Sequence, residues 1–155
     1  MDIRPARPEE AALLTGIALR SKAYWGYDEA FMAACREELT VGAEAIERSV
    51  TLVAEDGGRL LGFASLSGPP PTGSLDRLFV EPESIGRGVG RALFERARER
   101  AVTLGLRRLV IESDPNAEPF YLAMGATRTG SIPSGSIPGR ELPLLDLELA
   151  TTAGA

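Results

Sequence analysis

The sequence of 155 residues predicts one α/β domain in which helices cover a mixed β-sheet. The length is that of a single domain. Apolar residues recur every three or four positions in some segments and form short β-rich runs in others, with Gly and Pro between them. The predicted order is a strand, three helices, three strands, a helix, a strand, a helix and two strands. We expect residues 1–150 to form this domain and 151–155 to be a short flexible tail.

The first half of the chain starts with a strand and three helices and continues with a hairpin and a third strand. Pro8 suits a first helical turn, Asp28 suits an N-cap, and Gly57-Gly58 suits the turn of a hairpin. The prolines of segment 67–73 lack N–H donors and therefore predict a loop. The expected strands are 2–6, 50–55, 59–67 and 74–80, and the expected helices start at Pro8 and span 28–39 and 43–48.

The second half has helical and strand-like segments in alternation. Gly105 is placed as the residue after a helix C-terminus, and Asp114-Pro115 is placed to open the next helix. The segment 131–139 is rich in Ser, Pro and Gly, and we expect a loop that is either a lid or part of a dimer edge. The expected helices are 86–104 and 114–124, and the expected strands are 107–113, 126–130 and 142–149.

The composition excludes several classes of function. With 17 basic and 22 acidic residues the formal net charge is −5, which argues against a general nucleic-acid binder. The chain has no histidine, so catalytic triads that need His and His-ligated metal centres are excluded, and no metal is expected. Cys35 is the only cysteine, which excludes an internal disulfide. No apolar stretch approaches a bilayer span of about 18 residues, so we expect a cytoplasmic protein without membrane contact.

A turn with alternating glycines lies between a predicted strand and a long helix. Gly86, Gly88 and Gly90 lack the Cβ atoms that would keep a phosphate from the backbone, and the helix N-terminus supplies free N–H groups. Arg87 and Arg91 add positive charge. A plain connecting turn is the alternative. The spacing does not match the dinucleotide motif GxGxxG, and the Gly-Lys-Ser/Thr of a Walker A loop is missing.

This turn resembles the pyrophosphate loop of the GNAT superfamily of acetyl-CoA-dependent N-acetyltransferases. The family's loop reads Gln/Arg-x-x-Gly-x-Gly/Ala, and the segment 85–90 reads Ile-Gly-Arg-Gly-Val-Gly. Ile85 departs from the pattern by replacing the polar residue. Asn116 and Tyr121 further along the chain strengthen the resemblance, which extends over nearly the whole chain. It implies a mostly antiparallel sheet of about six to seven strands, in which the two central strands splay apart.

The resemblance also implies roles for particular residues. Pantetheine would pair with the backbone of Leu78 and Val80, and the N–H of Leu78 would polarise the thioester carbonyl. Tyr121 would donate a proton or a strong hydrogen bond to the leaving thiolate, although its helical position also suits core packing. Asn116 would bind pantetheine or the adjacent loop, with helix capping as the alternative. The expected acetyl-CoA-binding residues are Leu78, Phe79, Val80, Ile85, Gly86, Arg87, Gly88, Val89, Gly90, Arg91, Asn116 and Tyr121.

Asp76 is the candidate for the base that deprotonates the incoming amine. It lies on the central strand, and simple alternation places it in phase with Leu78 and Val80. In the histone-acetylating members a glutamate stands earlier in this strand, where this chain has Ser74. The other carboxylates near the expected site, which serve as alternatives, are Glu81 and Glu112.

The segment between the first two helices contains Tyr24, Trp25 and Tyr27, which could bind the acceptor or pack beneath the turn. We expect an enzyme that transfers acetyl from acetyl-CoA to a primary amine of a small molecule or peptide. The alternatives are a catalytically silent acyl-CoA sensor and a nucleotide-binding module, which the motif spacing opposes. A homodimer is compatible with this family, and the sequence does not identify the acceptor.

Overall fold

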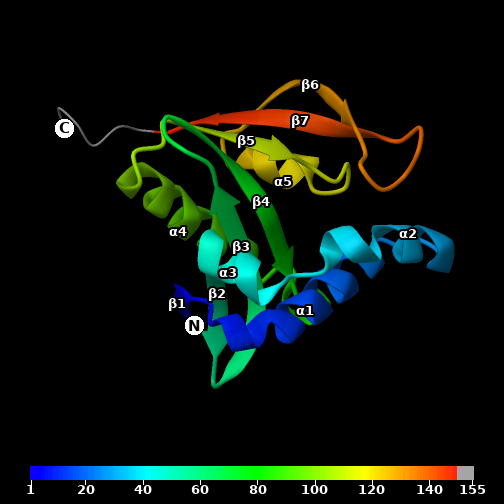
Figure 1. The fold of residues 1–155 in the computed structure, drawn as a ribbon, viewed down its shortest axis with the longest axis horizontal. Coiled ribbons are helices and arrows are strands. Elements are labelled where there is room, and N and C mark those ends of the chain that lie inside the picture. The colour runs from blue at the N-terminus through cyan, green and yellow to red at the C-terminus, as the bar shows by residue number, and fades with distance from the viewer. Residues whose placement is uncertain (150–155) are drawn as a thin grey trace.

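Seven strands form one sheet with the order β1-β2-β3-β4-β5-β7-β6 in the computed structural model, which describes residues 1–149 (Figure 1). Only β4 and β5 pair in parallel, and the other neighbours are antiparallel. The fold is therefore the predicted mixed, mostly antiparallel α/β fold. The predicted tail 151–155 lies outside the described residues. The strands are β1 Asp2–Pro5, β2 Val50–Asp56, β3 Arg59–Ser67, β4 Thr72–Val80, β5 Arg108–Glu112, β6 Thr127–Pro133 and β7 Glu141–Glu148.

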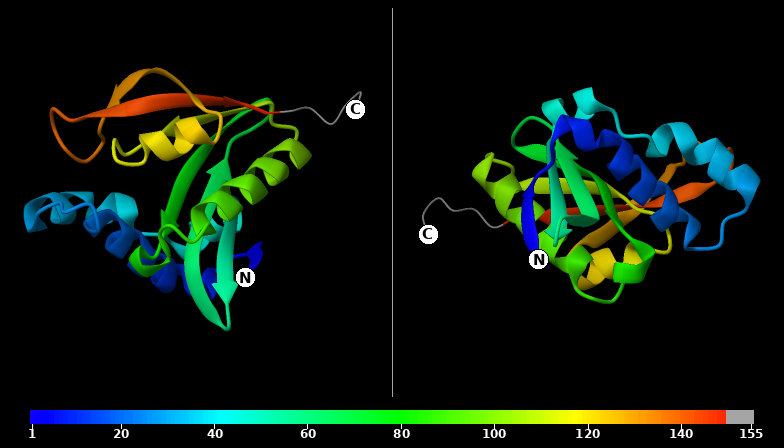
Figure 2. Two further views of the ribbon diagram at one scale, coloured as in Figure 1. Left: turned by 180° about the vertical axis from the view of Figure 1, so that it is seen from behind. Right: turned by 90° about the horizontal axis from the view of Figure 1, so that it is seen from below.

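Helices cover both faces of the sheet, and each face has its own apolar core (Figure 2). On one face α1 and α2 bury Leu14, Ile17 and Leu39 together with Phe63 of β3. On the other face α4 buries residues such as Leu93 against the strands. Within residues 1–149, no helix combines the length and the apolar character needed to cross a bilayer. The helices are α1 Ala11–Ala23, α2 Glu29–Leu39, α3 Ala43–Arg48, α4 Val89–Thr103 and α5 Glu118–Ala123, with short 3-10 helices at Pro8–Glu10 and Pro82–Ser84.

The predicted starts of α2 and α3 are confirmed, whereas α4 and α5 start later than predicted. The Asp28 carboxylate accepts a hydrogen bond from the Phe31 amide at 2.8 Å, as expected for the N-cap of α2. α5 starts at Glu118 because Asp114 instead accepts from the Asn116 amide, which closes a local turn before the helix. α4 starts only at Val89, because Gly86 and Gly88 both have left-handed backbone conformations.

The C-terminal hairpin is longer than predicted. β6 continues to Pro133 and pairs with β7 along residues 131–133, which the sequence placed in a loop. The remaining connection is therefore the segment 134–140. It folds back toward α2, where the Ser136 hydroxyl donates a hydrogen bond to the Glu38 carboxylate.

The two parallel strands separate after four residue pairs, which confirms the expected splay. β4 and β5 pair from Thr72–Arg108 to Leu75–Ile111, and β4 then continues to Val80 without β5 beside it. A bulge marks the point of separation, because Asp76 has no partner on β3 between the pairs Leu66–Leu75 and Ser65–Arg77.

The bulge overturns the expected phase of Asp76. Leu75 and Leu78 belong to the same apolar cluster as α4 although two residues separate them, so the side-chain alternation shifts at the bulge. The Asp76 carboxylate instead accepts hydrogen bonds from Ser67 and Ser74, at 2.6 and 2.5 Å. Asp76 therefore lies on the opposite face of the sheet from Leu78 and Val80.

Candidate active site

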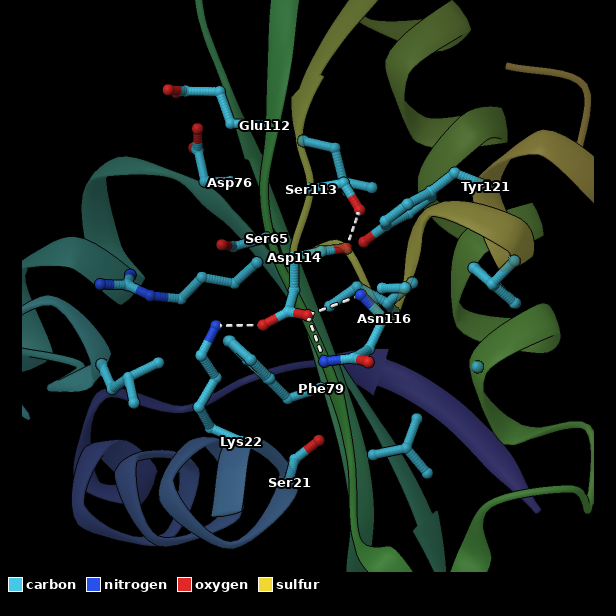
Figure 3. Close-up of a pocket in the computed structure, with 18 of the residues that line it drawn as sticks. Ser21, Lys22, Ser65, Asp76, Phe79, Glu112, Ser113, Asp114, Asn116 and Tyr121 are labelled. Atoms are coloured by element: carbon cyan, nitrogen blue, oxygen red, sulfur yellow. Dashed lines mark hydrogen bonds and ion pairs between the residues drawn. The ribbon is translucent and has the colours of Figure 1, made fainter. Parts of the chain in front are cut away.

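A cleft of about 890 Å³ runs through the opening between β4 and β5 (Figure 3). One wall is formed by β4 and by the glycine loop, defined as residues 84–91. The opposite wall is formed by the segment 112–121 from the end of β5 into α5. The ends of α1 and α2 and the hairpin segment around Arg140 close the remaining side. Parts of the chain far apart in sequence therefore enclose one site.

The glycine loop presents several free amides at the N-terminus of α4. The amides of Ile85 and Arg87 donate to Pro82 and Ser84, at 3.3 and 3.2 Å, and so serve the loop itself. The backbone N–H groups of Gly86, Gly88, Val89, Gly90 and Arg91 have no backbone acceptor among the described residues. Such a group of N–H donors, together with the positive end of the helix dipole, favours an anion.

The two left-handed glycines leave space in front of these amides. Gly86 has φ +84° and Gly88 has φ +82°, and a Cβ added at either would meet nothing within 4 Å. Ile85, at the position where the resemblance expects a polar residue, is exposed and lines the cleft. Of the twelve predicted cofactor-binding residues, Arg87 and Val89 do not line the cleft with their side chains.

The free edge of β4 supplies backbone groups to the same cleft. The Glu81 amide donates to the Leu61 carbonyl at 2.8 Å, so this residue points its polar backbone groups toward β3. Backbone direction alternates along an antiparallel pair, so the N–H and C=O groups of Val80 and Leu78 point away from β3. They face the opening that β5 has left, and the side chain of Phe79 between them packs against the cluster that contains Phe63.

Tyr121 reaches the cleft from α5, and aromatic packing fixes its ring. Phe94 of α4 and Phe120 contact the ring with centroid distances of 6.1 and 5.3 Å. The side chain is buried but lines the cleft, and Figure 3 shows the ring directed from α5 into the site. Burial raises the pKa of the Tyr121 hydroxyl, and the nearby negative charge of Asp114 raises it further. The phenol is therefore held as a neutral hydrogen-bond donor.

Asp114 is the centre of a polar network that the sequence did not reveal. Its carboxylate pairs with Lys22 of α1 at 2.5 Å and with Arg140 of the hairpin at 3.3 Å. The Tyr27 hydroxyl donates to Asp114 at 2.9 Å and accepts from Arg140 and from Asn116, at 2.8 and 2.9 Å. We call Lys22, Tyr27, Asp114, Asn116 and Arg140 the Asp114 network. The only available signal was that Lys22 is the single lysine of the chain.

The charges in the Asp114 network determine the ionisation of its members. Burial alone would raise the pKa of Asp114, but Lys22, the Asn116 amide and the Tyr27 hydroxyl together lower it. Burial and the Asp114 charge raise the pKa of Tyr27 to about 12. The network therefore holds one carboxylate, two cations and a neutral phenol at pH 7.

The predicted carboxylates have different surroundings. Asp76 lines the cleft and is held by two serine hydroxyls, whereas Glu112 lines it without a hydrogen bond or ion pair among the described residues. Glu81 is buried, pairs with Arg20 at 2.7 Å and does not line the cleft. The nearby Ser65 hydroxyl is buried and has no partner among the described residues.

The three aromatic residues after α1 separate in the structure. Trp25 lines the cleft mouth, and Tyr24, in edge contact with it, does not. Both are substantially exposed and so do not pack beneath the helix turn. Tyr27 stacks on Phe31 with a centroid distance of 3.9 Å and directs its hydroxyl to Asp114.

The splayed sheet places an open strand edge beside free amides at a helix N-terminus, which suits an extended ligand that carries an anionic group. Residues 18–126 match the model of the acetyltransferase (GNAT) family. The chain belongs to this family of acetyl-CoA-dependent N-acetyltransferases.

Solved structures support the same assignment. A GCN5-related N-acetyltransferase from Rhodopseudomonas palustris is 26% identical with a TM-score of 0.79, and the match covers 96% of this chain and 95% of that one. YncA from Salmonella typhimurium, solved with its cofactor acetyl-CoA, is 25% identical with a TM-score of 0.68 and coverages of 100% and 97%. The PaiA N-acetyltransferase from Thermoplasma acidophilum, in complex with coenzyme A, shares the fold at 20% identity, with a TM-score of 0.80 and coverages of 95% and 98%.

Proposed function

We propose that this protein transfers the acetyl group of acetyl-CoA directly to a primary amine of a small molecule or peptide, with both substrates bound in the cleft. The observation that carries the proposal is the meeting of three features in one cleft. These are the free edge of β4, the free amides of the glycine loop and the hydroxyl of Tyr121. The strand edge can bind an extended chain, the loop amides can bind an anion, and the Tyr121 hydroxyl can donate a proton or a hydrogen bond.

The residues present fit acetyl-CoA. The open space in front of Gly86 and Gly88 is where a diphosphate can approach the backbone, because no Cβ stands in its way. Arg91 lines the same part of the cleft and adds positive charge. The N–H and C=O groups of Leu78 and Val80 can pair with the amides of a pantetheine arm as an added strand would.

The side chain of Asn116, an expected pantetheine ligand, already makes hydrogen bonds within the protein. Its side-chain amide donates to the Tyr27 hydroxyl at 2.9 Å and to Asp114 at 3.0 Å, which leaves its carbonyl oxygen as the group available to a cofactor amide. Tyr27 and Asp114 therefore orient Asn116 for this role.

The chemistry assigned to the chain is positioning and charge stabilisation. The Leu78 N–H stabilises the oxyanion that forms at the thioester carbonyl when the amine attacks. The carbon–nitrogen bond forms, the carbon–sulfur bond breaks, and the Tyr121 hydroxyl stabilises the departing thiolate. An ordinary phenol has a pKa about 1.5 units above that of a thiol, and burial widens this gap at Tyr121. Tyr121 therefore acts mainly as a hydrogen-bond donor.

We propose Asp76 as the base that removes a proton from the ammonium form of the acceptor. Asp76 lines the cleft just after the last pair of β4 and β5, and the hydroxyls of Ser67 and Ser74 fix its carboxylate. Glu112 is the alternative, because it stands beside Asp76 where β4 and β5 separate.

The test of the proposed function is release of free coenzyme A from acetyl-CoA across a panel of primary amines, with mass analysis of each product. Acetylation of at least one amine, at a rate well above hydrolysis, is expected. Tight binding of acetyl-CoA by calorimetry without turnover of any amine would instead identify an acyl-CoA sensor. No binding at all would contradict both functions.

A further inference from the structure

The Asp114 network leaves a cationic surplus inside the cleft. Lys22 and Arg140 share the single carboxylate of Asp114, and the side chains of Lys22, Asp114 and Arg140 are only 12%, 13% and 17% exposed. Two positive charges thus face one negative charge in a sheltered place. Sheltered charge without a counterion is costly, so such a site favours an anionic ligand.

Both cations also retain unused hydrogen-bond donors. Lys22 uses one of its three N–H donors, on Asp114, and Arg140 uses only Nη2 among the described residues. The rings of Tyr27 and Phe31 hold both cations in place, with the Arg140 guanidinium carbon 4.8 Å from the Phe31 centroid. The free Nε and Nη1 of Arg140 form part of the fork that recognises a carboxylate or phosphate.

The remaining charges on this side of the cleft do not neutralise the surplus. Glu38 is the other acidic side chain there; it accepts a hydrogen bond from Ser136 and keeps its negative charge, which the positive charge of Arg77 offsets. Arg77 adds positive charge, and its guanidinium contacts only the backbone carbonyls of Glu38 and Thr40. Arg48 lines the same side and pairs weakly with Glu44 at 3.6 Å on the exposed surface.

The opposite end of the cleft is acidic. Asp76 and Glu112 follow directly after the last pair of β4 and β5, so they stand side by side where the strands separate. Neither has a cationic partner among the described residues. Figure 3 shows these two carboxylates at one end of the site, with Lys22 and Asp114 on the other side of Ser65. The cleft therefore has an end that suits an ammonium group and an end that suits an anion.

We infer that the acceptor is a small amine that also carries an anionic group, bound by Lys22 and Arg140 while its amine faces Asp76 and Glu112. This inference rests on the proposed acetyl transfer. It adds a substrate class, the amino carboxylates and amino phosphonates, that a general amine acetyltransferase would not prefer. Charge-assisted hydrogen bonds of about 1.5–3 kcal/mol each correspond to a preference of about 10- to 100-fold.

The experiment compares matched acceptors that differ only in the anionic group. Amino carboxylates of increasing chain length are assayed beside their carboxamides and the corresponding aminoalkyl phosphonates. Each rate is divided by the concentration of the unprotonated amine, because the amine pKa differs between the acceptors. At least one anionic acceptor is expected to exceed its carboxamide about tenfold or more in kcat/KM. A higher rate for the carboxylate identifies that group, and a higher rate for the phosphonate identifies the larger anion.

Variants of Arg140 locate the preference in the Asp114 network. Arg140→Gln should reduce the preference to about threefold or less and Arg140→Lys should retain part of it, and the Kd of acetyl-CoA is measured in each variant so that a change in cofactor binding is separated from loss of the anion site. Arg128→Gln is the matched control, because Arg128 lies on the same hairpin, pairs with Glu118 and does not line the cleft. If Arg140→Gln does not fold, Lys22→Gln takes its place.

Three results overturn the inference. Equal acetylation of carboxamides and anionic acceptors throughout the series is the first, and a preference that survives in Arg140→Gln and Lys22→Gln is the second; either result removes the anion site and leaves acetyl transfer intact. Absence of coenzyme A release with every amine, while acetyl-CoA still binds, overturns the proposed function and this inference with it.

Discussion

Gly86→Ala tests whether the glycine loop holds the diphosphate of acetyl-CoA. Gly58, in the β2–β3 turn, provides a matched control because the two glycines have nearly the same left-handed φ, +84° and +85°. A Cβ added at either position would meet nothing within 4 Å. The two substitutions therefore impose the same strain and differ only in their distance from the cleft.

The effect on stability should be the same in both variants. A left-handed conformation costs an alanine about 1–2 kcal/mol, and the lower entropy of the unfolded chain returns about 0.4–1 kcal/mol. The net loss is about 1 kcal/mol, which lowers Tm by about 2–4 °C in a domain of this size.

The effect on acetyl-CoA binding should differ. In Gly86→Ala the new Cβ enters the space where a diphosphate approaches, and relaxation of φ turns the Gly86 amide away from it. Loss of one hydrogen bond to a charged group, about 1.5–3 kcal/mol, raises Kd about 10- to 100-fold. Calorimetry with acetyl-CoA should show this change in Gly86→Ala and none in Gly58→Ala. Equal Kd values for the two variants, at equal Tm, would refute the assignment of the loop.

Three further predictions concern the cleft. Tyr121→Phe should lower kcat about 100-fold or more while the Kd of acetyl-CoA changes less than threefold, and steady-state kinetics showing an unchanged kcat would remove the donor role. Asp76→Asn should lower kcat/KM about 100-fold, whereas Glu112→Gln should change it less than threefold; the reverse pattern would make Glu112 the base. The pKa of Asp114 is lowered in the folded protein, so its contribution to stability is present above the ordinary pKa of about 3.9 and is lost as pH falls through the folded value. Asp114→Asn should therefore cost about 3 kcal/mol at pH 7 in urea denaturation and progressively less as the pH falls below about 3.9, and a cost independent of pH would contradict the ion pairing.

Part of the candidate site could be predicted because it depends on local backbone geometry. The spacing of glycines at 86, 88 and 90 predicted a loop with exposed amides before a helix, and the backbone there is left-handed at Gly86 and Gly88. Which amides of this loop are free could not be predicted. Those of Ile85 and Arg87 close a short turn within the loop, which the residue types do not reveal.

The Asp114 network could not be predicted, because its residues meet only after folding. Lys22 and Asp114 are 92 positions apart, and Arg140 approaches both from the hairpin. The phase of Asp76 was wrong for a related reason, since the bulge that shifts it depends on how β3 and β4 pair.

The order of helices and strands and the glycine loop before α4 can be predicted from the sequence alone. These features follow from side-chain periodicity and backbone sterics, which act over a few residues. Three features become visible only in the folded chain: the point where β4 and β5 separate, the backbone groups that are left free, and the pairing of one carboxylate with two cations from distant segments. Those outcomes depend on long-range packing and on the burial of charge, which no short stretch of sequence contains.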